Sequence, residues 1–345
     1  MKKFTAVVVL VAATSASAEV RLTGAGATFP QPLYERWVVE YQKSHPDVKV
    51  DYQGIGSGGG IKAITDKTGA FAGSDAPMNK KEIEAAGGEA ALVEVPTCAG
   101  GVVPAYNVPG VKDLNMTGDV LADIFLGKIT KWSDARIAAL NPKEKLPDLA
   151  ITPAWRTDGS GTTFVFTSYL AGQSEAFKST IGSGKQVSWP AGQGGKGNPG
   201  VAAVVQQTAG ALGYVEESYA TANKLAFAAV KNKAGKLVRA STASIAAAGA
   251  GAPMDGALLV ANIWDQTGDD AYPIASFTYV IVYRDLRNLK ARADAQALAA
   301  FLSWAVHDGQ KLAVELGYAP LAPAVQKKVD GALAGLTFEG APVAR

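Results

Sequence analysis

The sequence predicts an α/β protein whose helices pack on a largely parallel sheet. Strand-like and helix-like segments alternate along the chain, which is the pattern of repeated strand–helix–strand units. Glycine-rich turns join several of the expected strands to the helices that follow them. The 345 residues are enough for two domains, each with a core of its own.

Two strand–turn–helix units open the chain. Residues 19–26 (EVRLTGAG) predict a strand that runs into a turn, and residues 28–46 predict an amphipathic helix that ends at a His-Pro pair. Apolar and polar residues alternate over 47–56, which predicts a second strand. Residues 57–75 follow as a glycine-rich turn, a helix and a short strand.

The rest of the chain continues the alternation. Residues 91–108 predict two strands, interrupted by Pro96 and by the pair Gly100-Gly101, and we place a crossing between the two domains near this point. A return crossing is expected near the strand at 271–285. The other expected elements are helices at 121–129 and 132–140, a strand at 149–155, a loop, helix and strand at 194–216, a loop with some helix at 240–257, and a long amphipathic helix at 293–317.

The first 18 residues have the plan of a secretory signal peptide. Two lysines precede a short apolar run, and the segment ends in Ala16-Ser17-Ala18, so we expect cleavage after Ala18 and export. Cleavage would remove both lysines and leave 31 basic residues against 31 acidic ones. A nucleic-acid or membrane-surface binder normally carries a basic excess, so neither class of partner is expected.

Few residues are available for metal or nucleophilic chemistry. Cys98 is the only cysteine, which excludes an internal disulfide, and His45 and His307 are the only histidines. Neither Ser57 nor Ser160 lies in the G-x-S-x-G pattern of a hydrolase nucleophile. We therefore expect no metal, no cofactor and no catalytic residue, although a metal site made only of carboxylates stays open.

Three strand-to-helix turns share one chemistry: TGAGATFP at 23–30, GIGSGGG at 54–60 and TDGSGTTF at 157–164. The first N–H groups of a helix lack intrahelical partners and the helix dipole is positive there. Glycine lets a ligand approach the backbone, and serine or threonine adds a hydroxyl donor, so such turns suit an oxyanion. Any one of them could equally be an ordinary N-cap and tight turn.

Two charged residues accompany these turns. Arg156 could bind an anion with its guanidinium, held in place by Asp158, or could form an ordinary surface ion pair. Asp75 stands at the end of an expected strand, where ligands bind in open α/β sheets. A carboxylate fits an anion site only if the anion carries a proton, so Asp75 is either a helix cap or a detector of protonated oxyanions.

Six segments in order resemble the periplasmic phosphate-binding proteins of high-affinity phosphate ABC transporters: LTGAGATFP, YQGIGSGGG, GSDAP, IFLGKITKW, DGSGTTFVFTSYL and GGKGNPGVA. The resemblance runs from about Leu22 to the carboxyl-terminal region. It implies a two-lobed type II periplasmic-binding fold with two hinge crossovers and the ligand in the cleft between the lobes. The expected lobes are 19–100 plus 272–345, and 101–271. Two residues depart from the pattern: Gly58 replaces a serine and Trp155 an arginine that some relatives carry.

The resemblance also implies a ligand set and a physiological role. The implied phosphate ligands are Ala27, Thr28, Phe29, Ser57, Asp75, Arg156, Ser160, Gly161 and Thr162, with Asp158 behind Arg156. Asp75 would accept the proton of the phosphate. The protein would be a periplasmic, monomeric, non-enzymatic carrier that delivers phosphate to the permease and ATPase subunits of the importer.

Three other functions compete with this interpretation. A secreted phosphatase or other phosphoryl-transfer enzyme would need a nucleophile together with a metal or general acid, which the sequence does not supply. A binding protein for sulfate or molybdate would keep the fold, but Asp75 would then meet a fully ionised anion. A scaffold or adhesive surface protein is supported only by export.

Overall fold

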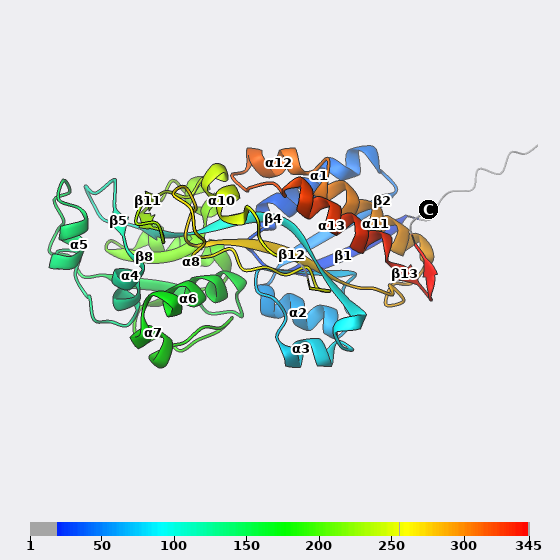
Figure 1. The fold of residues 1–345 in the computed structure, drawn as a ribbon, viewed down its shortest axis with the longest axis horizontal. Coiled ribbons are helices and arrows are strands. Elements are labelled where there is room, and N and C mark those ends of the chain that lie inside the picture. The colour runs from blue at the N-terminus through cyan, green and yellow to red at the C-terminus, as the bar shows by residue number, and fades with distance from the viewer. Residues whose placement is uncertain (1–18, 255, 344–345) are drawn as a thin grey trace, which may run out of the picture.

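The structure, a computed structural model, describes residues 19–254 and 256–343. The expected signal peptide at 1–18 lies outside the described residues. Within them the protein is a mixed α/β fold, which confirms the predicted class. Figure 1 shows an elongated molecule with two halves, joined along its long axis by the strands β4 and β12.

Nine strands of the described residues form one sheet, in the order β2-β1-β3-β12-β4-β8-β6-β7, with β9 also paired to β4. The strands are β1 (Val20–Gly26), β2 (Val48–Gly54), β3 (Phe71–Ser74), β4 (Leu92–Tyr106), β6 (Thr152–Arg156), β7 (Gln193–Gly195), β8 (Ala211–Glu216), β9 (Ala226–Phe227) and β12 (Ala275–Tyr283). Two small sheets contain β5 (Asn115–Met116), β10 (Ala229–Lys231) and β11 (Leu237–Val238), and β13 (Thr337–Phe338) and β14 (Ala341–Pro342).

The helices cover both faces of this sheet. In the half that holds β1 and β14 they are α1 (Gln31–Ser44), α2 (Ser57–Thr65), α3 (Lys80–Ala85), the 3₁₀ turn η1 (Glu89–Ala91), α11 (Arg292–Val306), α12 (Gln310–Glu315) and α13 (Pro323–Ala334). In the other half they are α4 (Gly118–Phe125), α5 (Ala135–Leu140), α6 (Gly161–Gln173), α7 (Glu175–Thr180), α8 (Gly197–Gln207), α9 (Glu217–Ala222) and α10 (Thr242–Gly249). Helices α11 and α13 lie on one side of the sheet and α2 and α3 on the other (Figure 1).

The expectation of a largely parallel sheet is wrong for the middle of the sheet. Strands β1, β2 and β3 are parallel, as are β6, β7 and β8. The central strands β12 and β4 are antiparallel to each other, and each is antiparallel to its outer neighbour, β3 or β8. The two strands that connect the halves run in opposite directions, because one leads into the second half and the other leads back.

The two strands expected in 91–108 are one continuous strand, β4. Pro96 is accommodated where the register with β12 shifts between Thr278 and Tyr279, an irregularity that tolerates a missing N–H donor. Gly100 does not interrupt the strand either. A β-carbon there would lie 2.6 Å from the ring of Phe29, so glycine admits that ring.

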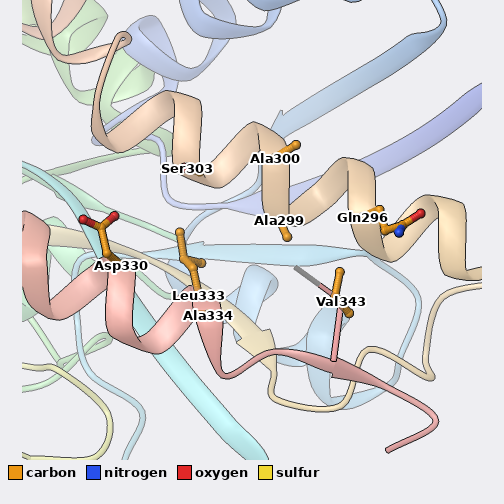
Figure 2. A pocket seen from close by; sticks show the side chains of 8 residues that line it. All are labelled: Gln296, Ala299, Ala300, Ser303, Asp330, Leu333, Ala334 and Val343. Carbon is orange, nitrogen blue, oxygen red and sulfur yellow. The ribbon is translucent and has the colours of Figure 1, made fainter. Parts of the chain in front are cut away.

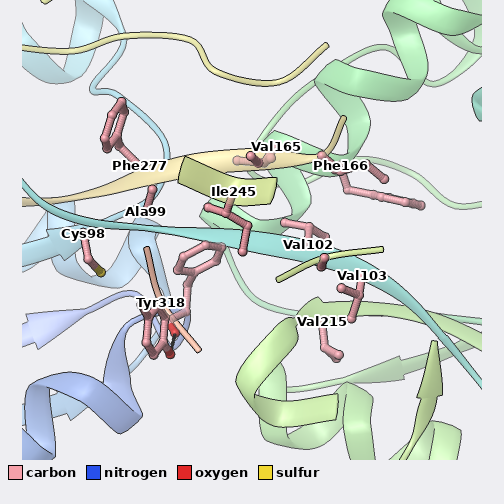
Figure 3. Packing of buried hydrophobic residues seen from close by; sticks show 14 of the residues in the cluster. Cys98, Ala99, Val102, Val103, Val165, Phe166, Val215, Ile245, Phe277 and Tyr318 are labelled. Atoms are coloured by element: carbon pink, nitrogen blue, oxygen red, sulfur yellow. Dashed lines mark hydrogen bonds between the residues drawn. The ribbon is translucent and has the colours of Figure 1, made fainter. Parts of the chain in front are cut away.

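Strand β4 is fully buried and forms the middle of the core. Figure 3 shows Cys98, Val102 and Val103 on this strand, with Phe277 of β12 and Tyr318 packed nearby. The strand pairs with β12 up to Gly101 and with β8 from Val102 onward. The turns that follow β1, β2 and β3 and those that follow β6 and β7 therefore belong to different halves of the molecule.

The long helix expected at 293–317 is two helices, α11 and α12, with a break at His307 to Gly309. The indole Nε1 of Trp37 on α1 donates a 2.8 Å hydrogen bond to the carbonyl oxygen of Gly309. A β-carbon at Gly309 would lie 2.8 Å from that Nε1 atom. The break is thus set by a side chain that comes from a distant part of the chain.

Candidate functional site

The three glycine turns meet in the folded protein. The backbone N–H of Gly58, at the start of α2, donates a 2.9 Å bond to the carbonyl oxygen of Gly159 in the turn before α6. The N–H of Gly161 donates a 3.0 Å bond to the hydroxyl of Ser57. A β-carbon at Gly58 would lie 3.2 Å from the α-carbon of Gly159, so glycine at this position permits the close backbone approach.

The first turn, after β1, presents two backbone donors. The N–H groups of Thr28 and Phe29 donate to no acceptor within 19–254 and 256–343. Their carbonyl oxygens are held by tyrosine hydroxyls, that of Thr28 by Tyr219 at 2.5 Å and that of Phe29 by Tyr318 at 2.7 Å. Ala27 differs, because its N–H already donates to the carbonyl of Gly73 at 2.8 Å. Thr28 and Phe29 can therefore serve an anion through the backbone, whereas Ala27 can only hold the turn.

Arg156 is held by Asp158. Its Nε and Nη2 atoms donate to the two carboxylate oxygens of Asp158 at 2.8 and 2.5 Å, a bidentate pair in which the arginine side chain is 1% exposed. Burial opposes ionisation of Asp158, but the hydrogen bonds from Arg156 outweigh it and lower the pKa of this carboxyl. Asp158 also accepts the N–H of Gly197 at 2.9 Å. Asp158 thus fixes Arg156 in place, as expected, and Arg156 is a buried cation rather than half of a surface pair.

The start of α6 supplies the other polar groups. Ser160 caps the helix, because its hydroxyl accepts the N–H of Thr163 at 3.0 Å. A β-carbon at Gly161 would lie 2.5 Å from the carboxylate of Asp75, so only glycine fits between that carboxyl and the helix. Thr162 is fully buried and accepts a 3.4 Å hydrogen bond from Nη1 of Arg156. These residues come from the half opposite to Ser57 and Asp75.

Asp75 is 1% exposed and lies just after β3. Its Oδ1 accepts a 2.9 Å hydrogen bond from the hydroxyl of Thr278 on β12. Burial raises the pKa of this carboxyl to about 7, although Thr278, Arg156, Ser57 and Thr162 all favour the ionised form. Near neutral pH such a group can share a proton with a ligand. It is not a helix cap, because α3 is capped by Asn79.

The structure thus brings all nine predicted ligand residues and Asp158 into one region. Together they offer free backbone N–H groups, hydroxyls and a buried guanidinium at the start of the 13-residue helix α6, which is an environment for an oxyanion. Trp155 points its indole elsewhere and donates to the carbonyl oxygen of Ala191 at 3.1 Å. The role of each residue as a ligand stays a prediction.

The sequence reasoning missed two buried residues of this region. Thr278 lies in a fully buried strand that also contains Ser276, so the sequence pattern does not single it out. Asn198 lies in the quoted segment GGKGNPGVA, but no role was assigned to it. Its side-chain amide donates to the hydroxyls of both Thr28 and Thr162, at 3.0 and 3.1 Å.

A surface depression of about 520 Å³ lies elsewhere, between α11 and α13 (Figure 2). Its lining is mostly apolar, and its one carboxylate, Asp330, is paired with His307 at 2.7 Å. Its lining holds no arginine or lysine, unlike the buried cluster with Arg156. Over the described residues, no group of three or more His, Cys, Asp or Glu side chains lies close enough together to hold a metal ion.

Comparisons with known proteins show the family to which the chain is similar. A family model described as a PBP superfamily domain matches residues 13–308. The phosphate-binding protein PstS of Pasteurella multocida (strain Pm70) is 44% identical, over 90% of this chain and 88% of the relative. That of Methanocaldococcus jannaschii is 39% identical, over 83% of this chain and 78% of the relative.

Solved structures show the same fold. A high-affinity periplasmic phosphate-binding protein (PfluDING), solved with bound phosphate, superposes with a TM-score of 0.73 at 20% identity, over 90% of this chain and 93% of that chain. A putative substrate-binding protein of a phosphate ABC transporter from Clostridium perfringens gives a TM-score of 0.64 at 20% identity, over 88% of this chain and 100% of that chain. With its sequence matched over nine-tenths of its length and its fold shared, this chain belongs to the PBP superfamily and, within it, to the family of PstS phosphate-binding proteins.

Proposed function

We propose that the protein binds inorganic phosphate in the buried polar cluster and delivers it to the permease of an ATP-driven phosphate importer. The observation that carries the proposal is that one anion environment contains both a buried arginine, Arg156, and a buried carboxyl, that of Asp75. Phosphate near neutral pH is both negatively charged and protonated, so it can use the guanidinium of Arg156 and the carboxyl of Asp75 together. The relatives' names support the same ligand.

The proposed ligand set divides between the two halves. Ser57, Asp75, the backbone and hydroxyl of Thr28 and the backbone of Phe29 lie on one side of the anion, and Arg156, Ser160, Gly161 and Thr162 lie on the other. Asp75 accepts the proton of the phosphate, while hydroxyls, N–H groups and Arg156 donate to its oxygens. The N–H groups of Ala27 and Gly161 are both occupied, by the carbonyl of Gly73 and the hydroxyl of Ser57, so the part proposed for each is to hold its turn beside the anion rather than to donate.

We further propose that the protein closes around phosphate as two lobes, 19–100 plus 272–345 and 101–271. Two features support these boundaries. Strand β4 changes its partner from β12 to β8 between Gly101 and Val102, and the return strand β12 begins at Ala275. Closure would bring the turn before α6 against the turn before α2, where Gly58 and Gly159 are bonded.

The proposed setting is the periplasm, reached through the signal peptide at 1–18, with the protein acting as a monomer. The partners are the transmembrane permease and ATPase subunits of the transporter. Within 19–254 and 256–343, no helix has the length and apolar character that a membrane crossing requires. We propose that the protein is not an enzyme; an assay for phosphatase activity on the metal-loaded protein tests the competing interpretation.

Replacing the buried arginine tests phosphate binding at this site. Arg156→Ala removes a desolvated, charge-assisted contact and leaves Asp158 without its partner, so binding should weaken by about 2–5 kcal/mol. That loss is about 30-fold to several thousandfold in the dissociation constant, measured by calorimetric titration of phosphate into ligand-stripped protein.

Arg136→Ala is the matched control, because Arg136 is half-exposed and pairs with Asp123 and Asp134 away from the cluster. The control should bind phosphate as the wild type does. An Arg156→Ala protein that folds and keeps the wild-type affinity would remove Arg156 from the site. A wild type that binds no phosphate would refute the function itself.

A further inference from the structure

Asn198 connects the two sides of the phosphate cluster, and no role has been assigned to it. It is the second residue of α8 and is fully buried. Its Nδ2 atom donates to the hydroxyl oxygen of Thr28 at 3.0 Å and to that of Thr162 at 3.1 Å. Both protons of the amide nitrogen are therefore used, one on each side of the site.

The orientation of this amide is fixed from behind. Its Oδ1 atom accepts a 2.9 Å hydrogen bond from the backbone N–H of Glu216, at the end of β8. An amide turned the other way would place its NH₂ group against that N–H, so the nitrogen must face the two threonines. Gly197 holds the backbone at a φ of +68°, a conformation that favours glycine, and so sets the position from which Asn198 reaches the site.

A count of donors and acceptors shows what this contact does to the threonines. A hydroxyl has one proton to donate and two lone pairs to accept with. The Thr28 oxygen accepts from Nδ2 and from the backbone N–H of Asn198, both at 3.0 Å, so its two lone pairs are occupied. The Thr162 oxygen accepts from Asn198 and from Nη1 of Arg156. Each hydroxyl is left with only its proton, and it can only donate.

We infer that Asn198 is a positioning residue that makes the hydroxyls of Thr28 and Thr162 obligatory donors toward the bound anion. The inference rests on the proposed phosphate-binding function. Hydroxyls that can only donate favour the unprotonated oxygens of the ligand, whereas the carboxyl of Asp75 favours the protonated one. Asn198 and Asp75 together would then determine which phosphate oxygen carries the proton. In another orientation the protonated oxygen would face a threonine hydroxyl that also donates, or an unprotonated oxygen would face the carboxylate of Asp75.

The test is a set of substitutions read by phosphate titration of ligand-stripped protein. Asn198→Ala leaves one lone pair of each hydroxyl unpaired, so each hydroxyl can rotate, and the dissociation constant should rise by about 10- to 100-fold. The buried Asn141 is the matched control. Its amide also makes backbone hydrogen bonds, to Asn115 and Ile137, but away from the site, and Asn141→Ala should bind phosphate as the wild type does.

A double-mutant cycle separates positioning from general stability. In a Thr28→Ser background the hydroxyl remains, and Asn198→Ala should have its full effect. In a Thr28→Val background only the Thr162 hydroxyl is left to orient, so about half of the free-energy cost of Asn198→Ala should remain. The rise in the dissociation constant should then be about the square root of the rise seen in the Thr28→Ser background. Equal effects in the two backgrounds, or an Asn198→Ala protein with wild-type affinity, would overturn the inference.

Two further readouts keep the outcomes distinct. If Asn198→Ala does not fold, Asn198→Asp keeps the shape but accepts from the hydroxyls instead of donating to them. Its affinity should fall at least as far, and wild-type affinity in Asn198→Asp would also overturn the inference. Wild-type protein is titrated in parallel: failure of the wild type to bind phosphate refutes the proposed function, whereas failure confined to the Asn198 comparisons refutes the positioning role alone.

Discussion

Asp75 has opposite effects on the empty and the occupied protein. In the empty protein its carboxyl is buried at 1% exposure, and burial outweighs the hydrogen bond from Thr278 and the other favourable contacts, so its ionised form is unfavourable. In the proposed complex the same carboxyl accepts a hydrogen bond from the protonated oxygen of the ligand, and this bond stabilises the buried negative charge. A group that destabilises the free protein and recognises one ligand is common at binding sites.

This conflict predicts a pH-dependent gain in stability for Asp75→Asn. The folded-state pKa of Asp75, about 7, lies above its ordinary value of 3.8, so the folded protein binds more protons than the unfolded chain between these values. Its contribution is fully present below pH 4 and is lost as pH rises through 7. Relative to Asp75→Asn, the ligand-free wild type should lose up to about 4 kcal/mol of unfolding free energy between pH 4 and pH 8.

Denaturant unfolding of both ligand-free proteins at several pH values measures this difference. Burial also raises the pKa of Glu94 to about 7, but this carboxyl is present in both proteins and its effect cancels in the comparison. A stability difference that stays the same from pH 4 to pH 8 would contradict a raised pKa at Asp75.

One ion pair joins elements of the two halves beside the site. Nζ of Lys185, in the segment after α7, lies 2.5 Å from the carboxylate of Glu82 on α3, and both side chains are mostly buried. The carbonyl oxygen of Lys185 accepts the N–H of Ser160 at 2.8 Å, so this segment also supports the start of α6. In the proposed closing motion this pair would hold α3 against the segment that supports the start of α6.

Lys185→Met should therefore weaken phosphate binding by about 2- to 10-fold at low salt, with less difference at high salt because the pair is then screened. Lysine is the residue to change, since Glu82 also completes the capping box of α3 with Asn79. Lys178→Met is the control, because its pair with Glu175 lies within α7 and is exposed. Phosphate titrations at two salt concentrations measure the affinities of both variants. An equal loss of affinity in Lys185→Met and Lys178→Met would mean that the loss comes from the change in surface charge and not from the pair with Glu82.

The elements that the sequence predicted well are those whose signals are local. Helix α2 starts after Gly56, which has a φ of +87°, and α6 starts after its cap Ser160, so each start has a signal within a few residues. Strand β4 was divided wrongly, since Pro96 and Gly100 usually interrupt strands. A register shift in β12 and the ring of Phe29 accommodate them here, and neither is visible near those residues in the sequence. The break after α11 depends on Trp37 in the same way.

The residues of the site, like the elements, could be predicted where their signals are local in the sequence. Each predicted ligand belongs to a short segment with its own signal, or was implied by the resemblance. Asn198 and Thr278 act through partners far away in the chain, on the opposite side of the site in one case and across the sheet in the other. Such contacts exist only after the sheet order is known, so one sequence could not rank these residues above other buried polar ones.

At the scale of the whole molecule, the two halves share one core. Two domains with cores of their own were expected, but a single cluster of buried apolar residues reaches from Leu22 beside α11 to Phe166 on α6, by way of β4. A smaller cluster lies around Ile61 and Ile281. In the proposed closing motion, β4 and β12 must therefore bend where they pass between the halves, while the turns on either side approach each other.

The central claim is that this protein selects a protonated oxyanion, with Asp75 taking the proton. Competition titrations of phosphate and sulfate against ligand-stripped wild type and Asp75→Asn test it most directly. The wild type should bind phosphate far more tightly, because sulfate has no proton near neutral pH and leaves the buried carboxylate facing an anion. Asp75→Asn should still bind phosphate, and its preference over sulfate should shrink, because the amide can both accept and donate. Equal binding of both anions by the wild type, or an unchanged ratio in Asp75→Asn, would contradict the claim.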